Sequence, residues 1–313
     1  MCFDRRRWCL TQFTNMCLSG RVPGVIQPVF CGASLFALCK KDGGIRPIAV
    51  GNTLRRLIAK AACRAVSSKI TAQFLPVQIG FGVQRATEAA AHAARRYVSS
   101  LQPGQGLLKL DFNNAFNSVR RDGVFKAIHE MLPELYPFIH TCYSNASLLN
   151  FGEFLLLSDE GTQQGDPLGP LMFCASTLKL IKRIESEFNL WFLDDGSLGG
   201  DVNILLKDLE LIRRIGEEIG LSLNEAKCEI VTNDQQVVNQ LRDVMPNIRH
   251  VPCSEAILLG APIGDDSTTD VILHQKLTVF QRLADRLISL TAHDALFLLK
   301  NCFSTPKLLY TLR

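Results

Sequence analysis

The sequence predicts an α+β fold in which an antiparallel sheet carries acidic residues at one edge. Two short apolar runs, over 107–110 and 190–193, have the length and composition of strands. The first run ends in Asp111 and the second in Asp194 and Asp195. Segments with helical periodicity lie between and after these runs. If the two strands are adjacent and antiparallel, all three carboxylates meet at one edge of the sheet.

Composition limits the class of protein. The 313 residues are 47% hydrophobic and 20% charged, which is ample for a large core. No apolar run approaches the roughly 18 residues of a membrane-spanning helix. The basic N-terminus is followed by no apolar segment, so we expect no signal peptide. Eleven cysteines without a Cys-x-x-Cys pair favour reduced intracellular thiols over a zinc site. The sequence is compatible with a nuclear location but does not specify one.

Charge is distributed unevenly along the chain. Residues 1–100 hold 15 Lys and Arg against 3 Asp and Glu, whereas residues 101–313 hold 19 against 27. A basic first third suggests a part that meets a polyanion, and the acidic remainder suggests a part that holds metal. Chance clustering of solvated surface charge is the alternative.

The first hundred residues predict helices around one hairpin. The expected elements are a helix over 1–20, strands over 35–39 and 45–50, and helices over 53–72 and 86–97. The hairpin tip carries three cations, Lys40, Lys41 and Arg46. Cations on a glycine-containing tip suit a triphosphate or a nucleic-acid backbone, although a solvated hairpin end has the same composition.

The helix over 53–72 is expected to begin at a cap formed by Asn52. Its basic residues, including Arg55, Arg56 and Lys60, are expected to face phosphates. Periodicity assigns its buried stripe to Leu54, Leu57, Ile58 and Ala61.

The remaining elements follow from the same patterns. We expect a helix that runs to about Met131, a strand over 155–157, a helix over 168–187, a strand over 189–193 and a helix over 203–219. A strand within 221–231, a short hairpin over 257–264 and helices over 274–290 and from 293 onward complete the chain.

The doublet Asp194-Asp195 precedes Gly196, and Asp-Gly after an apolar run predicts a tight hairpin turn. Two like charges side by side raise each other's pKa, and a hard divalent cation would remove that cost. An ordinary solvated Asp-Gly turn is the alternative. With Asp111 nearby, the carboxylates would suit two metal ions about 3.5–4 Å apart that clamp an in-line phosphoryl displacement.

Seven fragments in order resemble the reverse transcriptase domain of non-LTR (LINE-like) retrotransposons. They are LCKKDGGIRPIAVGNTLRRLIAK, QIGFG, KLDFNNAFNSV, GTQQGDPLGP, FLDDG, LSLNEAKCEIV and LLGAPIG. The resemblance runs from about Gly20 to beyond Gly264, which is most of the chain. The doublet reads Phe-Leu-Asp-Asp where many relatives have Tyr-Ala-Asp-Asp, a difference expected to affect packing more than chemistry.

The resemblance implies a right-hand polymerase fold of fingers, palm and thumb. It places an N-terminal helical extension at 1–24, fingers at 25–106, a palm with an antiparallel sheet at 107–264, and the start of a truncated helical thumb at 265–313. The implied activity is RNA-directed DNA polymerisation, in which a primer 3′-hydroxyl is extended with dNTPs and two Mg²⁺ ions serve as cofactors. The implied partners are an RNA template and a DNA primer or RNA–DNA hybrid. The oligomeric state is not specified.

The resemblance also assigns roles to individual residues. Asp111, Asp194 and Asp195 would hold the metals, together with the carbonyl of Phe112. Lys40, Lys41 and Arg46 would hold the triphosphate, Phe116 would select the sugar, and Gln164 and Gly165 would lie along the nascent base pair and template. Lys227 would protonate the pyrophosphate, and 258–264 would form the primer grip. Lys227 as a solvated lysine and Phe116 as a core residue remain open alternatives.

Two other functions fit parts of the sequence. A non-catalytic nucleic-acid binder would keep the fold, although a drifting relic should lose a metal carboxylate early and all three are present. An RNA-templated RNA polymerase would share the carboxylates, but the bulky Phe116 argues against ribonucleotide substrates.

Overall fold

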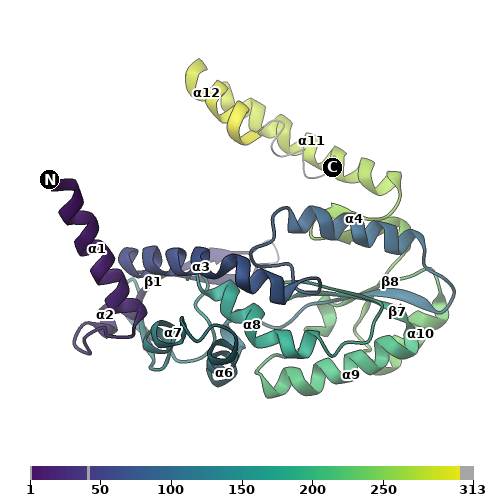
Figure 1. The fold of residues 1–313 in the computed structure, drawn as a ribbon. Helices are drawn as coiled ribbons and strands as arrows, with labels where there is room; N and C mark the ends of the chain where they lie inside the picture. Colours follow the sequence, from purple (N-terminus) through teal and green to yellow (C-terminus); the bar gives the residue numbers. More distant parts are fainter. Residues whose placement is uncertain (1, 41–42, 304–313) are drawn as a thin grey trace.

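Two β-sheets organise the chain, and helices pack around them (Figure 1). The computed structural model describes residues 2–40 and 43–303. The predicted role of Lys41 and the helical pattern expected over 304–313 therefore lie outside the described residues. The mixture of antiparallel-rich sheets and helices confirms the α+β class.

The larger sheet has five strands in the order β6-β7-β3-β8-β9. These strands are β3 (Gln105–Leu110), β6 (Phe188–Phe192), β7 (Asp195–Asp201), β8 (Glu229–Val231) and β9 (Arg249–Val251). The central strand β3 is antiparallel to both of its neighbours. Its buried leucines alternate between two cores: Leu108 joins the larger one and Leu107 the smaller one.

Helices cover both faces of this sheet (Figure 1). On one face α4 (Ala86–Ser99) brings Ala90, Ala91 and Ala94 into the smaller core. The other face is covered by α8 (Gly169–Ile181), α9 (Val202–Glu218) and α10 (Gln235–Val244). The predicted end of the 203–219 helix is confirmed, since Gly220 follows α9 with φ +83°.

The smaller sheet has the order β2-β1-β4-β5. It combines two hairpins from distant parts of the chain: β1 (Ala33–Cys39) with β2 (Ile45–Gly51), and β4 (Ser147–Phe151) with β5 (Phe154–Ser158). A short parallel pairing between β1 and β4 joins the hairpins. The continuous ranges 25–106 and 107–264 therefore do not separate the two sheets.

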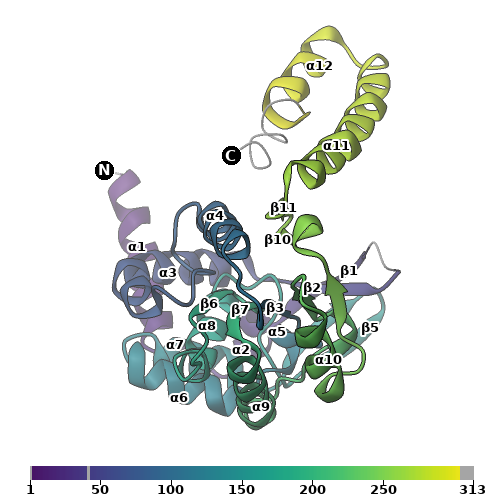
Figure 2. The ribbon, with the colours of Figure 1, turned by 90° about the vertical axis from the view of Figure 1, so that its right-hand side faces the viewer.

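Helices at both ends lie apart from the large sheet (Figures 1 and 2). At the N-terminal end are α1 (Cys2–Leu18), α2 (Gln27–Cys31) and α3 (Thr53–Phe74), with α6 (Arg121–Met131) and α7 (Tyr136–Tyr143) below α1 and α3 in Figure 1. The short helix α5 (Ala115–Ser118) instead follows closely after β3. After the short hairpin of β10 (Ile257–Leu258) and β11 (Ala261–Pro262), the chain rises into α11 (Asp266–Leu287), α12 (Ala292–Leu298) and a π-helical turn (Leu299–Phe303). No helix among the described residues is long and apolar enough to cross a membrane.

The predicted stripe of α3 was wrong in part. The cap is confirmed, because the Asn52 side chain accepts a hydrogen bond from the backbone N–H of Leu54 at 2.9 Å. However, Leu54 and Leu57 are 44% and 48% exposed and Ala61 is also exposed. The buried face consists of Arg55, Ile58, Ala59, Ala62, Val66, Ile70 and Phe74. The helix is rotated so that Arg55 faces inward.

The predicted tight hairpin turn after the apolar run is confirmed, but its placement at Asp-Gly was wrong. Phe192 pairs with Asp195, so the two turn residues are Leu193 and Asp194, and Asp195 already begins β7. Gly196 lies within the strand, where a Cβ atom would stand 2.6 Å from the ring of Trp191. The glycine therefore makes room for a buried tryptophan. The glycine-rich sequence of β7 has low strand propensity, which explains why no strand was predicted there.

Two predicted helices are shorter than expected. The pattern leading to Met131 is divided into α5 and α6, and α8 ends at Ile181 instead of about 187. The buried Asp208 accepts hydrogen bonds from the backbone N–H groups of Glu185 and Ser186 at 3.0 and 2.8 Å. These contacts fix a turn that directs the chain from α8 into β6.

Candidate active site

A cavity of about 730 Å³ separates the β1–β2 hairpin from the edge of the large sheet. Seven of the predicted site residues line it: Lys40, Arg46, Asp111, Phe112, Gln164, Asp194 and Lys227. Asp195, Phe116 and Gly165 are not among its lining residues. The cavity thus has Lys40 and Arg46 on the hairpin side, and Asp111, Asp194 and Lys227 on the sheet side.

The position of Asp111 is fixed by backbone contacts just beyond β3. Its carbonyl accepts a hydrogen bond from the N–H of Asn224 at 2.8 Å. The next residue, Phe112, forms an isolated antiparallel bridge with Leu223. The buried Phe112 ring also stacks on Trp191, with ring centroids 6.1 Å apart. Asp111 therefore sits on a rigid edge and not on a free loop.

Strand register brings the doublet to the same edge. Leu110 pairs with Gly196, so the next position on each strand places Asp111 across from Asp195. Asp194 lies in the turn between β6 and β7. The three carboxylates therefore meet at one edge, although not by the predicted pairing. The predicted apolar strand over 189–193 is β6, and β7 lies between it and β3, so the pairing that brings the carboxylates together is that of β3 with β7.

The electrostatics of this edge favour binding of a cation. Burial raises the pKa of Asp111, and Lys227 and Lys40 oppose that rise. Burial also raises the pKa of Asp194, with Asp111 adding to the rise and Arg46 opposing it. Desolvation, followed by the charges of Asp194 and Asp111, raises the pKa of Asp195 to about 6, although part of this side chain reaches solvent. The negative charge at the edge is therefore incompletely compensated.

Gln164 and Gly165 lie where the small sheet approaches the cavity. The backbone N–H of Ala49 in β2 donates to the carbonyl of Gln164 at 2.7 Å. Gly165 has φ +116°, and a Cβ atom there would stand 2.5 Å from the carbonyl oxygen of Ala49. A glycine is required at this position because the strand backbone passes so close.

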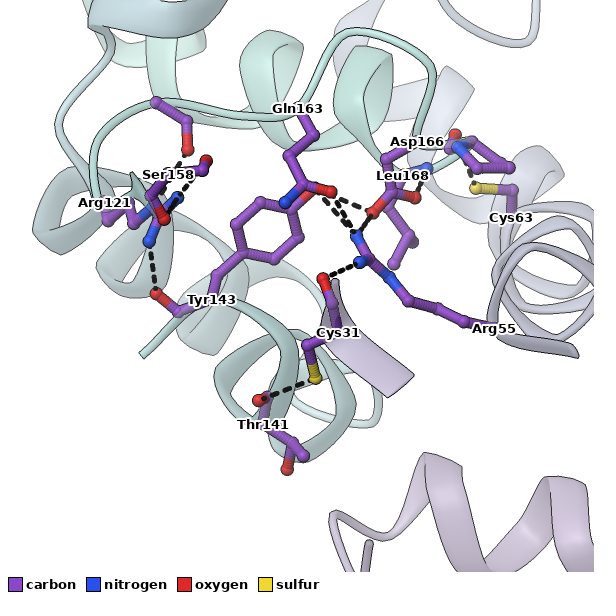
Figure 3. A network of polar contacts seen from close by, with 12 residues as sticks. Cys31, Arg55, Cys63, Arg121, Thr141, Tyr143, Ser158, Gln163, Asp166 and Leu168 are labelled. Atoms are coloured by element: carbon purple, nitrogen blue, oxygen red, sulfur yellow. Dashed lines mark hydrogen bonds and ion pairs between the residues drawn. The ribbon is translucent and has the colours of Figure 1, made fainter. Parts of the chain in front are cut away.

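Behind this loop, a buried polar network joins distant elements (Figure 3). Arg55, 1% exposed, forms an ion pair with Asp166 and donates to the Gln163 side-chain carbonyl at 3.1 Å. Asp166 also accepts from the Tyr143 hydroxyl at 2.7 Å and from the Leu168 N–H at 3.0 Å. The prediction that Arg55 faces phosphates was wrong: its guanidinium holds the loop that carries Gln164. This pairing also explains the rotation of α3.

Phe116 packs against the larger core and does not line the cavity. Its half-buried ring stacks on Phe173 of α8 with centroids 4.7 Å apart, at the border of the larger core. Its carbonyl accepts a hydrogen bond from the N–H of Thr162 at 2.6 Å. The role of Phe116 as sugar gate stays a prediction, and the packing on Phe173 gives the ring a defined orientation.

Sequence reasoning missed three asparagines that line the cavity, Asn113, Asn114 and Asn224. Asn113 donates from its side chain to the Leu223 carbonyl at 3.1 Å, and Asn114 has φ +49°. The polar run that follows Asp111 was a signal for the first two. Asn224 comes from a segment more than a hundred residues away, and only the fold brings it here.

The donor set at the edge suits magnesium. Among the described residues, no group of three or more His, Cys, Asp or Glu side chains forms a ready-made metal cage. Mg²⁺ is usually held by one or two carboxylates together with substrate phosphates and water, so a preformed cage is not required. Asp111 and Asp194 line the cavity, Asp195 is adjacent, and all three have raised pKa values. These oxygen donors with uncompensated charge fit a hard divalent cation.

The arrangement of sheets, helices and cavity defines a class of protein. Apo telomerase from Candida tropicalis has a similar structure at 10% identity, with a TM-score of 0.52 over 68% of this chain and 46% of that chain. Telomerase from Candida albicans, in complex with the TWJ fragment of telomeric RNA, is similar at 13% identity and the same TM-score, over 68% and 43%. The chain thus has the right-hand polymerase fold.

Within that class, the family follows from the sequence. Residues 38–261 match the family described as reverse transcriptase (RNA-dependent DNA polymerase), and the chain belongs to this family. The retrotransposable element SLACS 132 kDa protein of Trypanosoma brucei gambiense is 24% identical over 288 residues. That match covers 86% of this chain and 24% of the relative, so the chain spans about a quarter of the relative's length. The predicted resemblance to retrotransposon reverse transcriptases is confirmed.

Proposed function

We propose that this chain is an RNA-directed DNA polymerase that extends a primer 3′-hydroxyl with dNTPs by two-metal phosphoryl transfer. The hydroxyl oxygen attacks the α-phosphate, and pyrophosphate leaves. The observation that carries the proposal is the cavity in which Lys40 and Arg46 of the hairpin face Asp111 and Asp194 of the sheet edge, with Lys227 beside Asp111. A nucleoside triphosphate carries the charge that matches the cationic side, and its phosphates would reach the carboxylate side.

Each side of the cavity has a distinct task in this proposal. Lys40 and Arg46 hold the triphosphate and orient it toward the sheet edge. Lys227 stands beside Asp111, where it would donate a proton to the departing pyrophosphate. Phe116, on the first turn after Asp111, restricts the sugar. Gln164 and Gly165 support the nascent base pair, because they are anchored on one side to β2 and on the other to the Arg55–Asp166 pair.

Asp111, Asp194 and Asp195, with the carbonyl of Phe112, would hold two Mg²⁺ ions. When bound, these ions stabilise the charge on the attacking and leaving oxygens. The proposed partners are an RNA template paired with a DNA primer, and the basic first third of the chain is their expected contact surface. In the same proposal, residues 25–106 contribute the fingers, 107–264 the palm and 265–313 the start of the thumb, while 1–24 form an extension and 258–264 the primer grip.

Primer extension on an RNA template, with and without Mg²⁺, tests the proposal. The wild-type chain should add dNTPs only when Mg²⁺ is present. Asp194→Asn is nearly isosteric and removes a carboxylate whose pKa is raised, so it should not lower the melting temperature. It should nevertheless lower kcat by about 10²-fold or more, because charge stabilisation in the transition state is removed.

Two results would contradict the proposal in different ways. Extension by Asp194→Asn at the wild-type rate would show that the carboxylate assignment is wrong. Tight binding of primer–template without any extension by the wild-type chain would instead identify a non-catalytic nucleic-acid binder. Glu217→Gln, on the exposed part of α9 away from the cavity, serves as the matched charge-removal control.

A further inference from the structure

We propose that Gln78 is the positioning residue for the Asp194-Asp195 doublet. The inference rests on the proposed function, because it concerns how the chain aims these two carboxylates. Gln78 lies in the loop after α3, more than a hundred residues before the doublet, and its side chain is 0% exposed. It does not line the cavity and touches none of the three carboxylates through a described hydrogen bond, so its effect would pass through the backbone.

The Gln78 carboxamide holds the residue that precedes the doublet from both sides. Its Nε2 donates to the Leu193 carbonyl at 3.0 Å. Its Oε1 accepts from the Leu193 N–H at 3.0 Å and from the Gly80 N–H at 2.9 Å. A single side chain thus satisfies both backbone polar groups of Leu193, as a neighbouring strand would.

Leu193 requires such support because its backbone is strained. It has φ +59°, in the left-handed region that L-residues other than Asn and Asp seldom occupy. Strained residues persist only where the surroundings hold them. Because Leu193 and Asp194 form the whole turn between β6 and β7, a change in the Leu193 dihedral angles would redirect both carboxylates.

The loop backbone forms the rest of the clamp. The Trp191 N–H donates to the Val77 carbonyl at 2.7 Å, and the Ile79 N–H donates to the Trp191 carbonyl at 2.8 Å. A Cβ atom at Gly80 would stand 2.3 Å from the Leu193 nitrogen, so only glycine permits this approach. These contacts cover the outer edge of β6 and dock the loop, while the Gln78 side chain forms the hydrogen bonds to the turn residue Leu193.

If Gln78 only stabilised the fold, its substitution would change activity in a different way. In that case, removal of the Gln78 amide would lower stability and reduce activity only in proportion to the unfolded fraction. Ile79→Ala is the matched control, because Ile79 is a 6% exposed core residue of the same loop whose truncation leaves the Gln78 amide in place. The comparison is made at a temperature where both variants are folded.

The test measures kinetics and hydrogen exchange in Gln78→Met, Ile79→Ala and the wild type. Gln78→Met keeps the side-chain volume and removes all three hydrogen bonds. We expect kcat for primer extension to fall about tenfold or more while KM for dNTP stays within about twofold, since small misplacement of catalytic groups is costly. We also expect the Leu193 amide to exchange about fivefold faster. Gln78→Asn, which keeps the amide but cannot span both partners, should show the same pattern more weakly and serves if Gln78→Met does not fold.

Equal kcat and equal Leu193 exchange in Gln78→Met and Ile79→Ala would overturn the proposal. Failure of the proposed function is distinguishable, because a wild-type chain without extension activity would contradict that function alone. The exchange rate of Leu193 would then still decide whether Gln78 holds the turn.

Discussion

The three carboxylates at the sheet edge show how much the environment of a single residue can change its chemistry. Asp195 is the clearest case, because desolvation and the two neighbouring carboxylates raise its pKa to about 6 from an ordinary 3.8. In the metal-free protein the folded state therefore binds a proton more tightly than the unfolded chain does. Since the folded-state pKa is raised, the free energy of unfolding should fall as pH rises from about 4 through 6.

The substitution Asp195→Asn tests this. It should raise the melting temperature of the metal-free protein at pH 7.5 and leave it nearly unchanged at pH 4, where the wild-type carboxyl is already protonated. Thermal unfolding of both proteins across this pH range is the measurement. Addition of Mg²⁺ should raise the melting temperature of the wild type more than that of the variant. A variant that is less stable at pH 7.5 would show that the carboxylate is compensated by groups of the chain.

Phe116 is the second test at this scale. If its ring restricts the sugar, Phe116→Ala should raise ribonucleotide incorporation and largely preserve deoxynucleotide use. If the ring is mainly a packing partner of Phe173, the change should instead cost up to about 3–5 kcal/mol and lower both activities together. Incorporation efficiencies with dNTP and rNTP, measured alongside the melting temperature, separate the two outcomes.

At the scale of elements, the Arg55–Asp166 pair joins α3 to the loop before α8. Burial opposes the charge of Arg55, but Asp166, Tyr143 and Cys142 together outweigh it and raise the pKa of the guanidinium. Breaking one side of a buried pair leaves an uncompensated charge. Arg55→Met should therefore cost about 3–5 kcal/mol of unfolding free energy. The double variant Arg55→Met/Asp166→Asn should cost less than the sum of the single changes.

Urea unfolding of the single and double variants measures the coupling. The matched control is Lys69→Met, which breaks the exposed pair with Glu134 and should cost no more than about 1 kcal/mol. If the costs of the Arg55 and Asp166 changes simply add, the pair does not hold the loop against α3.

At the scale of the whole molecule, the excess of Lys and Arg in residues 1–100 bears on how the surface binds nucleic acid. Lys60 and Arg64 are one helical turn apart on the exposed side of α3 and remain candidates for phosphate binding. Arg55 is no longer a candidate, because it is buried. Template affinity should fall steeply with salt, and the double variant Lys60→Gln/Arg64→Gln should flatten the log–log slope by roughly 0.7–0.9 for each phosphate that is no longer neutralised. Binding titrations between about 50 and 200 mM salt test this. An unchanged slope would place the nucleic acid on another surface.

Local patterns in the sequence were sufficient for the features that a few neighbouring residues encode. The Asn52 cap, the end of α9 at Gly220 and the apolar strands that precede Asp111 and Asp194 were all predicted, because caps, glycine conformations and apolar runs act over a turn or a few residues. The ordered motifs also sufficed for the family.

Tertiary structure alone decided which way these elements face. Arg55 is indistinguishable in sequence from the solvent-facing cations of α3, and it turns inward because Asp166, 111 positions away, is buried opposite it. The β6–β7 turn consists of Leu193 and Asp194, and not of Asp195 and Gly196. Gln78 holds Leu193 in the turn, and Gly196 lies in β7 because the Trp191 ring occupies the space beside it. Each outcome depends on a partner distant in the chain. Periodicity within a segment carries no information about such partners, whereas the packed fold supplies the contact that sets the energy.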